Sequence, residues 1–461
     1  MASQKKVLGV FSLVMITVSA IVSLRNLPLL SSYGLSALFY YFIAAFGFLI
    51  PAALVAAELA TGWQEDGGVF AWVRAAFGES WGFVAIWFAT LINVSWLPTV
   101  LSFPAATLAF AFDPELAHNG TYILLFTLGV LWFATMVNYY GLTTSAFVSS
   151  VGTFLGTVLP GFLIILFGVW WVFNGHPIQF DTSISTILPP MGLEHIVFLG
   201  GVTLAFGGVE ITTYHIQETK NPQKDYFKAI AIAAFIVVTI SVVGTLSIAA
   251  VVPKEELSLV AGLMQAFAHF FEAFHLSFLL APLAVLAALG TLAQVNTWLI
   301  GPINGLFYSG KYGFLPDALM RENKYGAPVG VLFVQSIIAS ILASVFVLMP
   351  TVSGSYWLLT ALASQLQAIT YSLMFLSAIW LRYKHPDRPR AFRVPGGNIG
   401  MIIIAGIGLT CCLSVLILGF IPPATLNIGD IVYYELFLFF GMLALLAPGL
   451  VFIRRRIVNR P

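Results

Sequence analysis

Apolar runs of about twenty residues recur along the whole chain and alternate with short polar segments. A helix of that length crosses the hydrocarbon core of a bilayer, so the pattern predicts an integral membrane protein of the all-α class. We expect about twelve transmembrane helices. They cover residues 7–31, 37–61, 80–111, 121–138, 145–174, 194–217, 226–251, 277–309, 329–349, 354–383, 399–420 and 431–453.

Composition agrees with this prediction, because 59% of the 461 residues are hydrophobic and only 8% are charged. A soluble protein of this size needs far more polar surface to cover its core. No interval between the spans has room for a soluble domain, so residues 1–461 are expected to form a single polytopic membrane domain. Nothing in the sequence suggests a nucleic-acid partner. Membrane lipids are the expected surroundings.

Basic residues alternate between the two sides of the predicted membrane. The loops near 112–120, 175–193, 350–354 and 421–430 contain neither Lys nor Arg, whereas the opposite loops hold most of the 20 basic residues. The positive-inside rule assigns the basic side to the cytoplasm. We therefore expect a multi-pass protein of the inner (plasma) membrane with both termini cytoplasmic. The N-terminal "MASQKK" leads directly into a first span that we interpret as retained, not as a signal peptide.

The longest interval between spans, 252–276, has a helical pattern of its own. Its apolar residues share one face, which predicts an amphipathic helix on the outer surface. That face comprises Leu263, Phe267, Phe270, Phe271 and Phe274. We interpret His269, Glu272 and His275 as solvated residues of the polar face, and we expect neither a metal site nor a cofactor.

Charged residues also gather on the predicted cytoplasmic side. Glu58 lies near the inner end of the second span, and the turn "GWQEDGG" that follows is interpreted as structural. The Arg residues within 388–393 and 454–456 are interpreted as topology determinants that face anionic lipid.

Two spans contain signals for a helix break. In "LAFGGVE", Gly207 and Gly208 interrupt a hydrophobic helix, and Glu210 follows at once. In "TVSAIVSLRNLP" of the first span, small hydroxyl residues precede Pro28, which has no backbone donor. The signal in the first span is the weaker of the two because it lacks glycine.

Such breaks have a functional meaning. An unwound helix at membrane depth leaves amides and carbonyls unpaired, which is tolerated only where they line a polar cavity. Half-helix N-termini attract anionic groups, and carbonyl ends attract ammonium groups. Two facing breaks would therefore bind a zwitterion such as an amino acid. We predict a substrate site that includes Thr17, Ser19, Ala20, Phe206, Gly207, Gly208 and Glu210.

Four strings carry a resemblance to known proteins. They are "AAELATGWQEDGGVFAWV", "GVEITTYHIQETKNPQKDY", "WLIGPINGLFYSGKYGFLP" and "KHPDRPRAFRVPGG". Through them, and through their order and spacing, the chain resembles the amino acid–polyamine–organocation (APC) superfamily and, within it, the glutamate:GABA antiporter family of bacteria.

The resemblance implies a LeuT-type fold, with a five-plus-five inverted repeat, two further helices, and substrate bound between broken helices 1 and 6. The first repeat would cover about 7–174, the second about 194–383, and the additional helices about 399–453. It also implies exchange of an amino acid for its decarboxylated or deamidated relative.

The chain departs from the family's pattern where substrate choice would be decided. Family members that transport glutamate have a tyrosine at Arg25, a glutamate at Gln294, and a tyrosine at Gln367 that pairs with the one matching Tyr371. The family's C-terminal plug is not expected, since the sequence ends soon after the last span. We add Arg25, Gln294, Gln367 and Tyr371 to the predicted substrate site.

The roles of these residues remain open in the sequence. Arg25 would hold the side-chain carboxylate of an acidic substrate, pair with Glu210 or another carboxylate in an outer gate, or extend to the outer interface. Other polar residues would bind substrate or join helices to one another. This set comprises Gln294, Asn296, Thr297, Gln365, Gln367 and Tyr371.

Proton coupling or gating is assigned to Glu210, Arg25 and His215. An isolated carboxylate at membrane depth is costly and is functional by default, and a structural role in bridging unpaired amides is compatible with this. Histidine as a residue type titrates near neutral pH, which suits His215 to a cytoplasmic gate or pH sensor, and a helix-end structural role is the alternative.

These features favour a secondary amino acid transporter over other classes. The chain has no P-loop for ATP, no repeated filter of a channel, and no paired acids or metal cluster of an intramembrane enzyme. We predict an amino acid antiporter, with protons as a further partner. The alternatives are a proton-coupled neutral amino acid permease and a non-transporting amino acid sensor.

Overall fold

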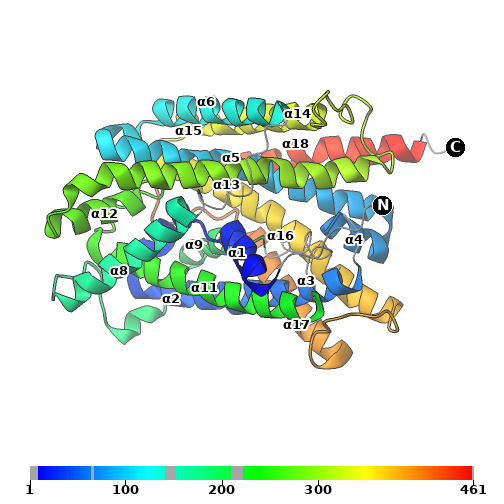
Figure 1. Cartoon of the computed structure of the whole chain (residues 1–461), viewed down its shortest axis with the longest axis horizontal. Helices are drawn as coiled ribbons and strands as arrows, with labels where there is room; N and C mark the ends of the chain where they lie inside the picture. The colour runs from blue at the N-terminus through cyan, green and yellow to red at the C-terminus, as the bar shows by residue number, and fades with distance from the viewer. Residues whose placement is uncertain are drawn as a thin grey trace.

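Long helices cross the molecule from one end to the other (Figure 1). This computed structural model describes residues 9–63, 67–140, 152, 154–190, 192–208 and 222–458. Within those ranges, nine segments have the length and hydropathy to cross a bilayer, and Leu193–Ala205 and Ser277–Leu292 are shorter apolar helices. Helix occupies part of each of the twelve predicted spans, so the all-α membrane fold is confirmed.

The elements of the first half include long α-helices and short 3₁₀ or π segments labelled η. They are α1 (Val10–Ile21), η1 (Leu24–Ser36), α2 (Ala37–Ala44), η2 (Ala45–Leu49), α3 (Ile50–Gly62), α4 (Val69–Phe77), α5 (Glu79–Phe112), η3 (Pro114–His118), α6 (Gly120–Tyr139), η4 (Phe154–Val158), α8 (Leu159–Phe173), η5 (Ile184–Ile187), α9 (Leu193–Ile196) and α10 (Leu199–Ala205).

The elements of the second half begin after residue 221. They are α11 (Pro222–Val251), α12 (Gly262–Ala273), η7 (Ser277–Leu279), α13 (Leu280–Gly310), α14 (Val329–Ala343), α15 (Val345–Leu348), α16 (Val352–Lys384), α17 (Gly397–Leu418) and α18 (Ile431–Val458). The boundaries of the two inverted repeats stay a prediction.

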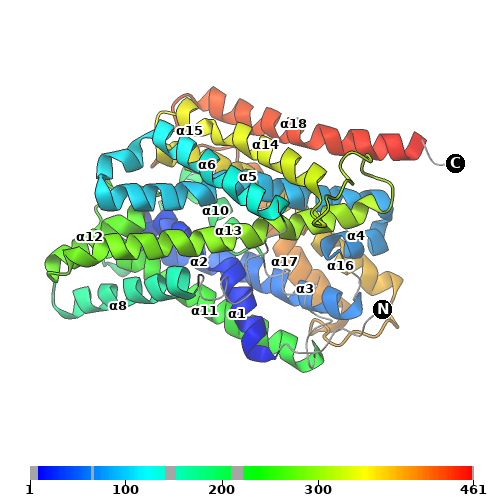
Figure 2. The same cartoon turned by 45° about the horizontal axis from the view of Figure 1, so that its top comes forward.

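Two helices form the centre of the bundle. The most apolar windows of α5 and α16 are 78% and 72% buried, whereas that of α18 is 17% buried. Helix α5 packs against both α13 and α16, and α18 runs along one edge of the molecule (Figure 2). Lipid and protein are equally apolar surroundings for such helices, so hydropathy does not decide which of them lie at the centre. Packing between the helices decides it.

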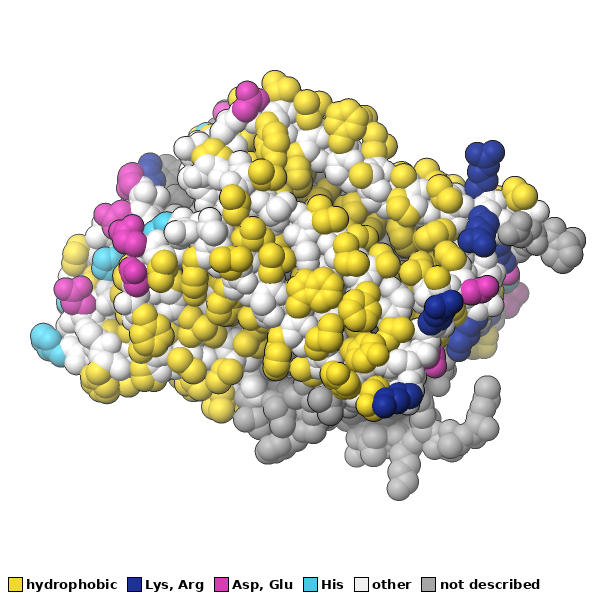
Figure 3. Space-filling view, turned by 90° about the horizontal axis from the view of Figure 1, so that it is seen from above, with side chains coloured by type: hydrophobic (Ala, Val, Ile, Leu, Met, Phe, Trp, Pro, Cys, Tyr) yellow, Lys and Arg dark blue, Asp and Glu magenta, His cyan; other side chains and the backbone are white. Residues whose placement is uncertain are grey.

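Charged side chains are segregated to the two ends of the molecule. Lys and Arg gather at one end, where some Asp and Glu also lie, and the other end shows mainly Asp, Glu and His (Figure 3). We call these the basic end and the acidic end. The basic end holds the C-terminal ends of α3, α4, α16 and α18, and the acidic end holds η3 and α12. This separation is what the loop charges predict, and the side of the membrane that each end faces stays a prediction.

The amphipathic helix predicted within 252–276 is α12. Its apolar residues Leu263, Phe267 and Phe270 are buried, but they pack against the protein instead of lipid. Across that interface, Phe274 stacks on Trp170 of α8 with ring centroids 3.9 Å apart. Gly262 lies beside Pro28, where a Cβ would come within 2.8 Å of the proline ring. Helix α12 therefore covers η1 at the acidic end.

Candidate substrate site

The first predicted helix break is present between α1 and η1. The α-helix ends at Ile21, and Val22 and Ser23 have extended backbones with ψ of 119° and 117°. The chain then resumes as a 3₁₀ segment that contains Pro28. The prediction of a break in span 1 is confirmed, although it rested on hydroxyl residues and one proline.

The second break ends α10. Phe206 has a ψ of 0°, and Gly208 has a φ of 104°, which favours glycine. A Cβ on Gly207 would collide with the Gln367 carboxamide of α16. Each glycine therefore has its own reason to be there: Gly207 allows a close approach, and Gly208 turns the chain out of the helix.

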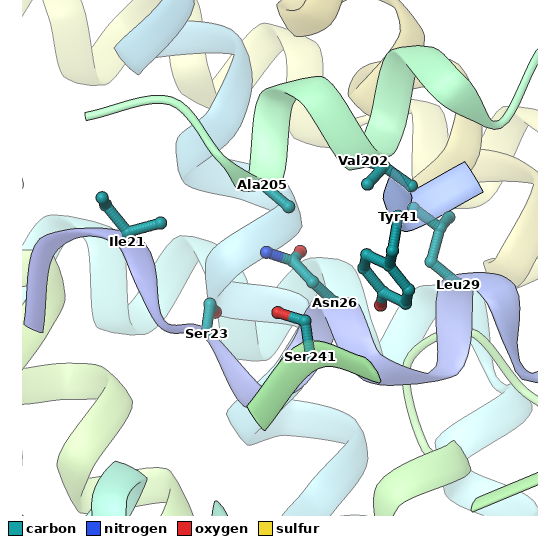
Figure 4. Close-up of a pocket in the computed structure, with 8 residues that line it drawn as sticks. All are labelled: Ile21, Ser23, Asn26, Leu29, Tyr41, Val202, Ala205 and Ser241. Carbon is teal, nitrogen blue, oxygen red and sulfur yellow. The ribbon is translucent and has the colours of Figure 1, made fainter. Parts of the chain in front are cut away.

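The two breaks lie side by side around one pocket (Figure 4). The pocket is small, with a cavity volume of about 10 Å³, which is room for one water molecule at most. It is lined by Ile21, Ser23, Asn26, Leu29, Tyr41, Val202, Ala205 and Ser241. Residues on both sides of the first break thus share a cavity with the last turn of α10, and a larger solute would need the helices around it to move apart.

Hydrogen bonds hold the η1 side of this pocket in place. The Leu27 carbonyl accepts from the Thr245 hydroxyl of α11 at 2.9 Å and from the Ser31 hydroxyl at 3.0 Å. Thr245 in turn shares a hydrogen bond of 2.8 Å with the Tyr41 hydroxyl. One side chain of α11, Thr245, thus supplies a hydrogen-bond partner for the backbone of η1.

Helix α16 supplies partners for the break in α10. The Gln367 amide nitrogen donates to the Thr203 carbonyl at 2.7 Å, and the Gly208 N–H donates to the Tyr371 hydroxyl at 3.0 Å. Gln367 and Tyr371 are one helical turn apart, so they face the same break. Gln365 points elsewhere and donates to the Leu416 carbonyl of α17 at 3.1 Å.

Arg25 lies in η1 with its side chain 3% exposed. Its Nη1 donates to the hydroxyls of Thr99 at 3.1 Å and Tyr356 at 3.0 Å, and the guanidinium lies over the Trp96 ring at 5.2 Å. Nε is buried without a hydrogen-bond partner. Being enclosed, the guanidinium does not extend to the outer interface. No carboxylate among the described residues is within ion-pair distance of it.

The remaining predicted residues are placed only in part. Thr17 is buried and donates to the Leu13 carbonyl one turn earlier, so its hydroxyl is already paired. Phe206 is also buried. Glu210 and His215 lie outside the described residues, as do the side chains of Ser19, Ala20 and Gln294. Their roles in the site stay predictions.

Sequence reasoning missed the residues that complete the site. Tyr41 and Ser241 line the pocket, and Thr99 and Tyr356 hold Arg25. These are single hydroxyl residues on long apolar helices, where the sequence offers no local signal for them. Asn26, which also lines the pocket, did lie in the segment predicted to break.

A family model described as amino acid permease matches residues 8–444. The chain belongs to the amino acid permease family. Its relatives include a transporter of Legionella pneumophila, 42% identical over 96% of both chains. Two glutamate/gamma-aminobutyrate antiporters of Lactococcus lactis are each 29% identical over 95% of this chain and 88% of theirs. A probable agmatine/putrescine antiporter of that species is 22% identical over 86% of this chain and 84% of its own.

The family and these relatives place the chain among the transporters of the APC superfamily, and it is not an enzyme. A helical transporter with this many apolar spans is a membrane protein. The resemblance predicted from the four sequence strings is confirmed.

The transporter also has a buried ionic cluster at its basic end. The Glu58 carboxylate of α3 is 2% exposed and pairs with the Nε atoms of Arg382 at 2.9 Å and Arg390 at 3.4 Å. Its second oxygen accepts from the Val394 amide at 2.7 Å. Arg390 also donates to the Leu381 and His385 carbonyls. We call Glu58, Arg382 and Arg390 the basic-end cluster.

This cluster corrects the interpretation of the Arg residues within 388–393 as lipid-facing. Arg390 is buried, and burial lowers the pKa of its guanidinium while Glu58 opposes that shift. Arg388 is exposed but donates to the Gly62 carbonyl at 2.6 Å and lies over the Trp63 ring. The charge of this segment alone predicts contact with lipid, whereas in the structure the segment binds the C-terminal end of α3.

We predict that Glu58→Gln destabilises the folded transporter by about 3–5 kcal/mol, because it leaves two buried guanidinium groups without their carboxylate. Thermal unfolding of the purified protein in detergent measures this. Glu256→Gln is the control, since that side chain is exposed at the acidic end. Equal unfolding temperatures for the two variants would contradict a stabilising role for the cluster.

Proposed function

We propose that this transporter is an amino acid antiporter that exchanges an acidic amino acid for a related solute by alternating access. The adjacent breaks around one pocket carry the proposal. They bring a carbonyl end of α10 and the start of η1 to the same cavity, and such ends bind the ammonium and carboxylate groups of an amino acid.

Arg25 supports the acidic class of substrate. The hydrogen-bond acceptors that the described residues offer to this buried guanidinium are neutral, which is costly, and a carboxylate would compensate its charge. The Tyr356 hydroxyl that accepts from Arg25 also donates to Asn26, whose side chain lines the pocket. The guanidinium is thus one hydroxyl away from the cavity between the breaks. We propose that it binds the side-chain carboxylate of the substrate.

The relatives support exchange over one-way uptake. The Lactococcus lactis proteins are named as antiporters of glutamate with gamma-aminobutyrate and of agmatine with putrescine. In each pair the two solutes have related structures; glutamate and gamma-aminobutyrate differ in net charge, whereas agmatine and putrescine are both divalent cations at neutral pH. We propose exchange of this kind for the present chain, in a plasma membrane with both termini cytoplasmic, since the basic end then faces the cytoplasm.

We predict that vesicles loaded with unlabelled glutamate and containing the purified protein take up labelled glutamate, and that empty vesicles do not. Exchange requires solute on both sides, whereas a proton-coupled permease needs only a pH gradient. Acidic, amide, aromatic and basic amino acids are compared at pH 5 and pH 7. Uptake into empty vesicles driven by a pH gradient, with a preference for neutral amino acids, would support the permease alternative. Binding without uptake would indicate a sensor.

Glu210 is proposed to couple transport to protons. We predict that Glu210→Gln flattens the change in exchange rate between pH 5 and pH 7, because an amide cannot release a proton. The same assay with Glu256→Gln is the control for loss of a carboxylate elsewhere. A normal pH profile at a normal protein level would remove Glu210 from the coupling mechanism.

We predict that Arg25→Gln lowers kcat/KM for acidic amino acids by about 10- to 150-fold, which corresponds to the loss of a charge-assisted hydrogen bond. Exchange of glutamine would be far less affected, and Arg25→Lys would keep part of the preference for glutamate. Arg321→Gln, at an exposed position, is the control. Equal losses for glutamate and glutamine would instead assign Arg25 to an outer gate.

A further inference from the structure

Gln367 makes an unusual contact at the break in α10. In an unbroken α-helix the Gly207 N–H would bond to the Thr203 carbonyl. Here it donates to Leu204 at 3.1 Å, so the Thr203 carbonyl loses its helical donor. The Gln367 amide nitrogen takes that place at 2.7 Å. The contact therefore fills a position that is open because α10 ends here.

This carbonyl belongs to the turn of α10 that lines the pocket between the breaks. Val202 and Ala205, its neighbours in the same turn of α10, both line the cavity with Ser23 and Asn26. A freed carbonyl at the C-terminal end of a half-helix carries partial negative charge, and an ammonium group is its natural ligand. The substrate of the proposed antiporter brings such a group.

We propose that Gln367 and the ammonium group of the substrate compete for the Thr203 carbonyl, and that Gln367 thereby sets substrate affinity. This inference rests on the proposed function. Both groups are N–H donors of similar reach, but the ammonium group makes the stronger, charge-assisted bond. Binding moves the carboxamide away from Gly207, against which it packs. Tyr371 keeps its bond to the Gly208 N–H and holds the break open.

A second glutamine on α16 allows this role to be separated from helix packing. Gln365 and Gln367 are both buried, and each donates from Nε2 to a backbone carbonyl of a neighbouring helix. Both carbonyls lie at the end of a helix without their helical donor, since the Phe420 N–H donates to Ile417 and not to Leu416. Only the Thr203 carbonyl belongs to a turn that lines the pocket. A merely structural role would give the two residues the same mutational effect.

The test compares Gln367→Met with Gln365→Met in vesicles, because methionine keeps the side-chain volume and removes the donor. For L-glutamate exchange, we expect Gln367→Met to lower KM by about two- to tenfold, the worth of one neutral hydrogen bond. Gln365→Met is expected to leave KM unchanged. Glutarate, which lacks the ammonium group, is added as a competitor and should inhibit wild type and Gln367→Met equally.

The outcomes separate this inference from the proposed function. Absence of glutamate exchange by the wild type would sink both. Exchange by the wild type together with an unchanged or raised KM in Gln367→Met would overturn the competition alone and leave Gln367 as a link between helices. A lowered KM for glutamate that is matched by tighter glutarate inhibition would also overturn it, since the gain would not depend on ammonium. If Gln367→Met is not folded, Gln367→Leu is measured in the same way.

Discussion

Peptide groups in hydrocarbon need hydrogen-bond partners, and the site of this transporter is built around two places where helices stop providing them. At the first break the backbone of η1 bonds to Thr245 and Ser31. At the second, α16 supplies one donor and one acceptor to α10. Apart from Ser31, which lies in η1 itself, the partners come from α11 and α16, which remain continuous. A pair of broken segments is thus supported by regular neighbours, and the pocket lies where those supports leave space.

Two buried charges of the bundle, Glu58 and Arg25, differ in whether an opposite charge lies beside them among the described residues. Glu58 is surrounded by two guanidinium groups and an amide, so its negative charge is well compensated. Arg25 has hydroxyls and aromatic rings, and none of the described carboxylates is within ion-pair distance of it. Removing one partner of a compensated buried pair is strongly destabilising, whereas a buried charge with no described counter-charge is a candidate to bind an ion from solution. The difference separates a structural cluster from a candidate binding group, although both contain buried arginine.

Much of the fold followed from hydropathy, because span length and loop charge are properties of single segments. The break at Gly207 and Gly208 was equally visible, since glycine has a direct backbone meaning. Partners were not. Whether Gln367 meets a substrate or the Thr203 carbonyl depends on how α16 lies beside α10, and no local pattern encodes that. The basic residues after α16 illustrate the same limit: their charge predicted a side of the membrane, but Arg390 is used for its geometry against Glu58.

The basic-end cluster has a consequence for how the protein is made. Glu58 belongs to the second span, while the amide that it accepts from is 336 residues further along the chain. When the early spans enter the membrane during synthesis, their acid has no arginine to meet, and a lone carboxylate in a span is poorly tolerated by lipid. The carboxylate at the end of the second span would therefore have to stay near water until α16 and the segment after it are made. Closure of the cluster would come before α17 and α18 are added.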